Sequence, residues 1–237
     1  MRFLKIFSLF VFILTSFVST SAQELKKPIA DEYIQHLERV FAHIAELDQK
    51  YRSYIQWKTL DKQIITKIDS IFNNVGVAEG VAYQKSLNLS LPQSIKDSLN
   101  NLQWSLDLQN HMTIRGIWAT YGFIPKSIIK ENNFVQQLLL LHPPKGWDIP
   151  TFHKEYSELL IVEVHAGRMP AKSYANFYDN ILCKILQKPQ LYGTNKHIDA
   201  KTGTMLPPII EDLTQTNNAR QEIGMPLLTE GEYRLEK

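Results

Sequence analysis

The chain has 237 residues, of which 44% are hydrophobic and 21% are charged, and its formal net charge is +2. This length can bury a sizeable core, and the composition is ordinary for a globular protein. The near balance of charge excludes a basic surface that would attract nucleic acid, and the single cysteine excludes an internal disulfide.

The first 22 residues have the three parts of a secretory signal peptide. Arg2 and Lys5 give a basic start, an apolar run follows over residues 6–18, and small residues end at Ala22. The run is shorter than the roughly 20 residues of a membrane-spanning helix. We therefore expect cleavage after about Ala22 and export, either to the periplasm or out of the cell. The alternative is an uncleaved anchor, which would be the only membrane contact; Gln23, not Cys, follows the cleavage point, which argues against a lipid anchor.

Helical periodicity dominates residues 23–237, which we expect to form a single helical domain. The predicted helices cover about residues 30–54, 59–73, 95–121, 130–141, 151–165 and 170–187, with a shorter turn near 81–85. Ser94 is the expected N-cap of the longest helix, and Gly122 is its expected end. Pro170 suits the first position of the last of these helices.

The periodicity changes after residue 187. Residues 190–198 and 204–209 flank a turn that contains Gly203, which predicts a β-hairpin. A short helix, capped by Thr214 or Thr216, is then expected to run to Ile223, and the last residues to form a loop. The sequence therefore predicts a mainly α fold, an irregular multi-helix bundle with one small C-terminal β-hairpin.

Polar residues continue the apolar stripes of five predicted helices, because residues three or four apart share a helix face. These positions are Asp48 with Arg52, Asn110 with Asp107, His142, Glu163, and Asp179. A buried charge without a partner is costly, so we expect these groups to pair with each other, with the backbone or with a ligand. Two interpretations stay open: an internal network that fixes helix register, or a polar pocket.

Familiar catalytic and cofactor motifs are missing. The sequence has no His-Glu-x-x-His, no Gly-x-Ser-x-Gly and no glycine-rich phosphate loop, so we expect no metal and no cofactor. The one metal arrangement worth testing combines Asp48, His142, Glu163 and Asp179. Cys183 lies in an apolar run and is expected to be a buried structural thiol, not a nucleophile. The other histidines, His111 and His153 among them, are expected at the surface or in packing.

Residues 190–195 carry a resemblance to a known family. Gln190-x-Tyr192-Gly193-Thr194 resembles the late Gln-x-Tyr-Gly-Thr-Gln signature of a bacterial family of domains of unknown function. Other pieces match in order: Leu47-Asp48-Gln49-x-x-Arg52, Asp107-x-x-Asn110 before Gly122, Leu141-His142, Ala175 with Asp179, and Arg220-x-x-Ile223-Gly224-Met225. The resemblance covers about residues 47–233 and implies a mainly helical fold with no established activity. Asn195 replaces the usual Gln and Asn180 a common Arg, changes that could loosen a network or alter a ligand.

Three functions follow from these residues. The first is an exported domain of the cell envelope that binds a small or peptidic ligand, through Arg52, Asn110, Gln190, Tyr192, Thr194 and Arg220. The second is a hydrolase- or lyase-type enzyme, with His142 or one of Asp48, Asp107 and Asp179 as general base. The third is a purely structural polar network. In each case we expect residues 190–195 to cover a cluster formed by Asp48, Arg52, Asn110, His142 and Asp179.

Overall fold

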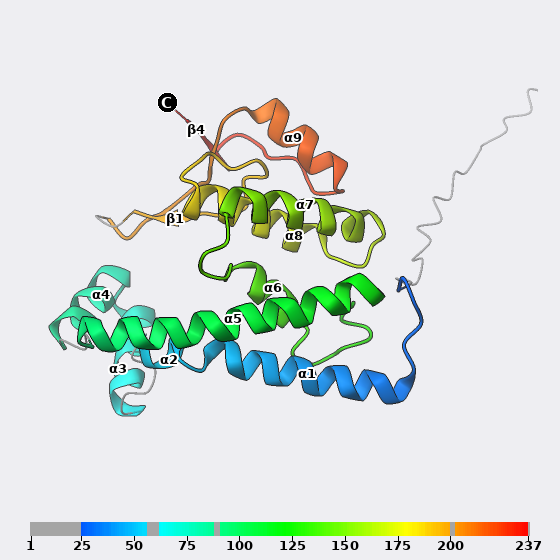
Figure 1. The fold of residues 1–237 in the computed structure, drawn as a ribbon. Coiled ribbons are helices and arrows are strands. Elements are labelled where there is room, and N and C mark those ends of the chain that lie inside the picture. Colours follow the sequence, from blue (N-terminus) through cyan, green and yellow to red (C-terminus); the bar gives the residue numbers. More distant parts are fainter. Residues whose placement is uncertain (1–24, 56–61, 88–90, 200–201, 237) are drawn as a thin grey trace, which may run out of the picture.

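A computed structural model describes residues 25–55, 62–87, 91–199 and 202–236 of the chain. Figure 1 shows two layers of helices with the short helix α6 (Val135–Leu140) between them. The predicted fold class, mainly α with a small C-terminal hairpin, is confirmed. No helix in the described part of the chain has both the length and the apolar character needed to cross a membrane.

The first layer is built on two long helices, α1 (Asp31–Gln49) and α5 (Gln93–Tyr121), which pack side by side (Figure 1). The short helix α2 (Arg52–Ile55) also packs against α5. At one end of this layer, α3 (Lys62–Asn74) and α4 (Val77–Ser86) pack against each other. Helix α4 is longer than the turn predicted near 81–85, and residues 59–61 of the predicted second helix lie outside the described residues.

The helix predicted over residues 30–54 is interrupted at Lys50 and Tyr51. The side-chain amide of Gln103, on α5, explains the interruption. Its oxygen accepts from the main-chain N–H groups of Tyr51 (2.9 Å) and Arg52 (3.3 Å), and its nitrogen donates to the carbonyl of Leu47 (3.1 Å). These bonds satisfy backbone groups that a continuous helix would pair internally.

Helix α5 buries Asp107 and Asn110, as predicted, but its buried face also includes residues outside the predicted stripe. Its buried residues are Gln103, Asp107, Asn110, His111, Ile114, Ile117 and Trp118, whereas Leu102, eight residues before Asn110 at helical spacing, is 49% exposed. Polar partners on α1 and α2 make this polar face the buried one. The helix begins at Gln93 after Pro92, so Ser94 is not its cap, but it does end at Gly122, where φ is +80°.

The segment predicted as a helix over 130–141 is helical only from Val135. Asn132 adopts a left-handed conformation, with φ of 56°, which a helix cannot include. The next residue, Asn133, donates its side-chain N–H to the carbonyl of Ile124 at 2.8 Å. This bond holds the segment as a loop against the end of α5.

The second layer consists of α7 (Ile149–His165), α8 (Ala171–Asn180) and a π-helical continuation, η1 (Ile181–Ile185). Asp148 caps α7 by accepting from the main-chain N–H of Thr151 at 3.1 Å, so the helix starts slightly before the predicted Thr151. Pro170 precedes α8 as its N-cap, not as its first residue.

The strands are short. β1 (His197–Ile198) and β2 (Met205–Leu206) form the predicted antiparallel hairpin. Two further strands, β3 (Ile209–Ile210) and β4 (Arg234–Leu235), pair in parallel, so the tail is not a simple loop. Gln190 forms an isolated parallel bridge to Ile210 in place of a strand.

Helix α9 (Leu213–Glu222) lies between β3 and β4 in the sequence and covers the second layer (Figure 1). Its N-cap is Asp212, which accepts from the main-chain N–H of Gln215 at 2.6 Å. Neither predicted cap holds that place, because Thr214 and Thr216 both lie inside the helix, where Thr216 is buried.

The apolar core joins the two layers. Its largest fully buried side chains include Phe41 from α1, Trp118 from α5, Tyr156 from α7 and Phe177 from α8. Tyr156 contacts both Trp118 and Phe152 through its ring, at centroid distances of 6.2 and 4.4 Å. Burial of this apolar surface is the main stabilising contribution to the fold.

Candidate functional site

The predicted polar residues form three separate clusters, not one. The first, the Arg52 cluster, consists of Asp48, Arg52, Gln103 and Asp107. Arg52 donates to both carboxylate oxygens of Asp107, at 3.0 and 2.7 Å, and lies 3.1 Å from a carboxylate oxygen of Asp48. Gln103 donates to the same Asp107 carboxylate at 2.9 Å. The guanidinium group therefore balances two carboxylates that are almost fully buried, at 0% and 1% exposure.

His142 joins this cluster from the end of α6. Its Nδ1 lies 2.9 Å from Oδ1 of Asp48, and a quarter of its side chain is exposed. The main-chain carbonyl of His142 is 3.0 Å from Nε2 of His111, whose other ring nitrogen is 3.3 Å from the hydroxyl of Tyr156. A chain of polar contacts thus runs from Asp48 into the core.

Burial and charge act in opposite directions on these groups. Burial opposes ionisation of Asp48, but the hydrogen bond and charge of His142 and the charge of Arg52 hold the pKa of that carboxyl below its ordinary value. Burial lowers the pKa of the His111 imidazole, which favours its neutral form. Burial also raises the pKa of Tyr156 to about 12. The environment therefore favours the ionised form of Asp48 and the neutral forms of His111 and Tyr156.

The second cluster surrounds Glu163 at the end of α7. This carboxylate is 1% exposed, and it accepts from Arg168 at 2.6 Å and from the main-chain N–H of Phe123 at 2.8 Å. Lys26 forms an ion pair with it at 2.9 Å. Burial opposes ionisation, but these partners hold the pKa of Glu163 below its ordinary value. Glu163 therefore links the segment before α1 to the second layer.

The third cluster surrounds Asp179, which is fully buried near the end of α8. Its Oδ1 accepts from the main-chain N–H groups of Leu191 and Tyr192, and its Oδ2 from the N–H and the hydroxyl of Thr194, all at 2.8–2.9 Å. Burial raises the pKa of this carboxyl despite the four hydrogen bonds that favour its ionised form. One side chain thus fixes the path of the loop.

Residues 190–195, the Gln190 loop, also hold themselves closed. The side-chain amide of Gln190 donates to the carbonyl of Asn195 at 2.7 Å and accepts from its main-chain N–H at 2.8 Å. Gly193 has φ of +63°, and a Cβ there would lie 2.7 Å from Cδ1 of Leu228, so glycine suits this turn. Arg220 donates to the carbonyl of Tyr192 at 2.6 Å from the other side.

The expected neighbours of the Gln190 loop were largely wrong. Of the five predicted neighbours, Asp179 alone hydrogen-bonds to the loop within the described residues, while Asp48, Arg52 and His142 contact one another in the first layer. Asn110 is 1% exposed, and its amide nitrogen has no hydrogen-bond partner in the described part of the chain. Gln190, Tyr192, Thr194 and Arg220 all bond to other parts of the protein.

The metal arrangement proposed from the sequence does not form. Asp48 and His142 touch, but Glu163 and Asp179 belong to different clusters. Across the described ranges, no three side chains of His, Cys, Asp or Glu gather as a metal ion would require.

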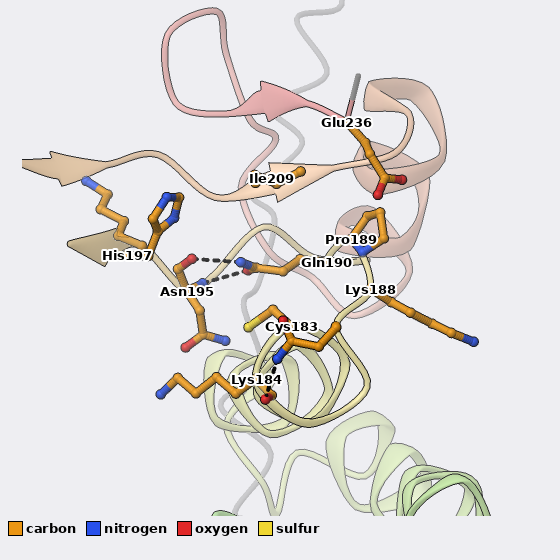
Figure 2. A pocket seen from close by; sticks show the side chains of 11 residues that line it. Cys183, Lys184, Lys188, Pro189, Gln190, Asn195, His197, Ile209 and Glu236 are labelled. Atoms are coloured by element: carbon orange, nitrogen blue, oxygen red, sulfur yellow. Dashed lines mark hydrogen bonds between the residues drawn. The ribbon is translucent and has the colours of Figure 1, made fainter. Parts of the chain in front are cut away.

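A pocket of about 300 Å³ opens beside the Gln190 loop (Figure 2). Its lining residues are Cys183, Lys184, Gln187, Lys188, Pro189, Gln190, Asn195, Lys196, His197, Ile209 and Glu236. The half-buried thiol of Cys183 lies beside Gln190 and Asn195 in Figure 2, so the expectation of a buried thiol was wrong. Burial and the nearby charge of Asp179 raise the pKa of this thiol, which leaves it a poor nucleophile.

The sequence patterns did not identify Gln103. It lies four residues before Asp107 on the same helix, a spacing that places both side chains on one face. Lys184 was also missed; it lies in the last turn of a helix, a position that favours cations. Lys188 follows the end of that helix. Lys196 carries no such signal, because only the fold of the loop brings it to the pocket.

Comparison with family models, with curated proteins and with solved structures gives no match for this chain. The resemblance to the family with the Gln-x-Tyr-Gly-Thr-Gln signature stays a prediction.

Proposed function

We propose that this chain is an exported cell-envelope domain that binds a small or peptidic ligand in the pocket beside the Gln190 loop. The observation that carries the proposal is a concave site whose wall is fixed in advance. Asp179 and Gln190 hold the loop through hydrogen bonds on both sides, so a ligand would meet an ordered surface. A preorganised wall lowers the entropy cost of binding.

The size of the pocket limits the ligand. At about 300 Å³ it lies at the lower end of ligand sites, which span roughly 300–1,000 Å³. A ligand of about dipeptide size fits this volume. The lining combines apolar surface from Ile209 and Pro189 with amide groups from Asn195 and Gln187, a mixture that suits a peptide.

A thermal-shift panel of dipeptides of acidic, basic, polar and apolar classes tests this proposal. At least one class is expected to raise the melting temperature, because a ligand that binds only the native state stabilises it. The variant Ile209→Trp fills the pocket and should lose the shift, while Ile198→Trp, at a similarly exposed position outside the pocket lining (45% against 37%), should keep it. No shift with any class, or a shift that survives Ile209→Trp, would contradict the proposal.

The export part of the proposal has its own test. It rests on the basic, apolar and small-residue segments of the first 22 residues. N-terminal sequencing of protein recovered from outside the cytoplasm should give a chain that starts near Gln23. A chain that retains Met1 and stays in the cytoplasm would overturn it.

One observation favours a second candidate, a hydrolase- or lyase-type enzyme. Asp48 is buried and lies 2.9 Å from Nδ1 of His142, whose side chain is partly exposed. A carboxylate that accepts from Nδ1–H leaves Nε2 as an acceptor, which is the tautomer of a general base. Chromogenic esters, phosphoesters and glycosides test this candidate. Turnover by the wild type that falls at least about 100-fold in His142→Asn would support it, and equal turnover in both would refute it.

A further inference from the structure

The pocket beside the Gln190 loop carries an uneven set of charges. Lys184, Lys188 and Lys196 are exposed at its rim, and none of them forms an ion pair with an acidic side chain of the described chain within 4.0 Å. Glu236 is the acidic residue of the lining. Unpaired ammonium groups around a concave surface attract anions, since the surface between them concentrates the field.

Lys184 and Glu236 lie on different sides of the pocket. In Figure 2, Lys184 and His197 lie on one side, and Glu236 lies on the other side with Pro189 and Lys188. Arg234 adds charge on the His197 side, because its guanidinium nitrogen is 2.7 Å from Nε2 of that imidazole. Glu236 is held in place through its main chain, whose N–H donates to the carbonyl of Ile210 at 2.9 Å. A ligand with separated charges would match this arrangement.

We infer that the ligand of this pocket is a short acidic peptide, with carboxylates against Lys184 and Lys196 and its ammonium group against Glu236. This inference rests on the proposed binding function and names the class of ligand.

The same features argue against a phosphate group as the ligand. The described lining includes lysines but no arginine, whereas planar bidentate recognition of phosphate relies on arginine. A phosphate that filled the pocket would also face the carboxylate of Glu236. A peptide that carries both carboxylates and an ammonium group avoids this conflict, because its ammonium group can face Glu236.

Isothermal titration at low ionic strength, with the full mature chain, tests the inference. The probes are L-glutamyl-L-glutamate, the isosteric L-glutaminyl-L-glutamine, the N-acetylated acidic peptide and inorganic phosphate. We expect the acidic peptide to bind about five- to ten-fold more tightly than its amide isostere. Each exposed charge pair contributes about 0.2–1 kcal/mol, which corresponds to roughly 1.4- to 5-fold, and the factors of two such pairs multiply. Its affinity should fall with added salt.

Single substitutions identify which charged side chains of the pocket contribute to binding of the acidic peptide. Lys184→Gln and Lys196→Gln should each weaken the acidic peptide about two- to five-fold. Lys172→Gln, an exposed lysine on α8 outside the pocket lining, removes the same charge and should change nothing. N-acetylation should also weaken binding, and Glu236→Gln should abolish that difference.

The outcomes separate the ligand class from the binding function. Equal binding of the acidic peptide and its amide isostere would overturn the acidic class and leave the pocket as a binding site. Equal effects of Lys184→Gln and Lys172→Gln would also overturn the acidic class, since they would show attraction by overall charge alone. Inorganic phosphate that binds as tightly as the peptide would overturn it for the same reason. Failure of both dipeptides to bind, together with no shift in the thermal panel, would remove the binding function itself.

Discussion

The substitution Asp179→Asn tests how the Gln190 loop is held. The amide oxygen of the variant can keep the hydrogen bonds from the main-chain N–H groups of Leu191 and Tyr192, at 2.9 Å each. The amide nitrogen then faces the main-chain N–H of Thr194, which lies 2.9 Å from Oδ2 in the native protein, and both groups are donors. The Thr194 hydroxyl can turn to the carbonyl of Ala175, 3.4 Å away. One backbone donor is left without a partner.

The magnitude follows from these bonds. A buried donor that loses its partner costs about 1–3 kcal/mol, and the loss of a hydrogen bond to a charged group adds about 1–2 kcal/mol. Removing the buried charge offsets part of this loss, because burial disfavours the ionised carboxylate, as the raised pKa of Asp179 indicates. We therefore expect Asp179→Asn to lower the free energy of unfolding by about 2–4 kcal/mol.

Urea unfolding at neutral pH, followed by circular dichroism, measures this loss. The matched control is Asp212→Asn, which removes the same charge from the exposed N-cap of α9. Asparagine caps a helix about as well as aspartate, so the control should change stability by only about a few tenths of a kcal/mol. If both variants lose an equally small amount of unfolding free energy, Asp179 does not organise the Gln190 loop.

Three further results are expected from unfolding experiments. Arg52→Met leaves the buried carboxylates of Asp48 and Asp107 without their cation and should cost about 3–5 kcal/mol; a cost below about 1 kcal/mol, as for an exposed ion pair, would contradict the burial of the cluster. Because the pKa of Glu163 is lowered in the folded state, the stability that it contributes is present above the ordinary pKa of about 4.3 and is lost as the pH falls through the lowered folded value. Glu163→Gln should therefore be less stable at neutral pH and decline less in acid, and an acid decline equal to that of the wild type would refute this. Gly193→Ala should cost about 1–3 kcal/mol, because its φ is +63°, while Gly116→Ala, inside α5 with nothing within 4 Å of the added Cβ, should be neutral or stabilising by up to about 1 kcal/mol.

The sequence predicted the helical class because apolar spacing repeats along most of the chain. Helix ends marked by glycine with positive φ, such as Gly122, were also predictable, because few other residues adopt that conformation. The break at Lys50 was not predictable from local spacing. It depends on Gln103, a residue distant in the sequence whose amide replaces intrahelical hydrogen bonds.

The buried face of α5 shows why a stripe of apolar residues can mislead. Leu102 fits the periodic pattern and is exposed, whereas Gln103 and Asp107 are buried because Arg52 and the end of α1 pair with them. A pattern that counts only hydrophobic residues cannot identify a face that is buried through hydrogen bonds.

Asp48, Asp107, Asn110, Glu163 and Asp179 were expected on the inner faces of helices and are buried, whereas Arg52 and His142 are partly exposed. The predicted grouping of these residues was wrong. Asp48 and Asp179 both continue apolar stripes and both are fully buried, and nothing in their spacing separates them. Their separation arises from the packing of helices into two layers (Figure 1), a long-range property. The pocket depends on the same packing, since its lining comes from η1, the Gln190 loop, β1, β3 and the residue after β4.

The alkylation rate of Cys183 tests most directly whether a ligand binds in the pocket beside the Gln190 loop. This residue is the only cysteine of the chain and lines the pocket, so the unmodified protein reports on its own site. We expect a saturating dipeptide that stabilises the protein to slow the reaction of this thiol with iodoacetamide several-fold, and Ile209→Trp to slow it without any peptide. If the stabilising peptide leaves the alkylation rate unchanged, the peptide binds elsewhere, and the proposed binding site in this pocket is wrong.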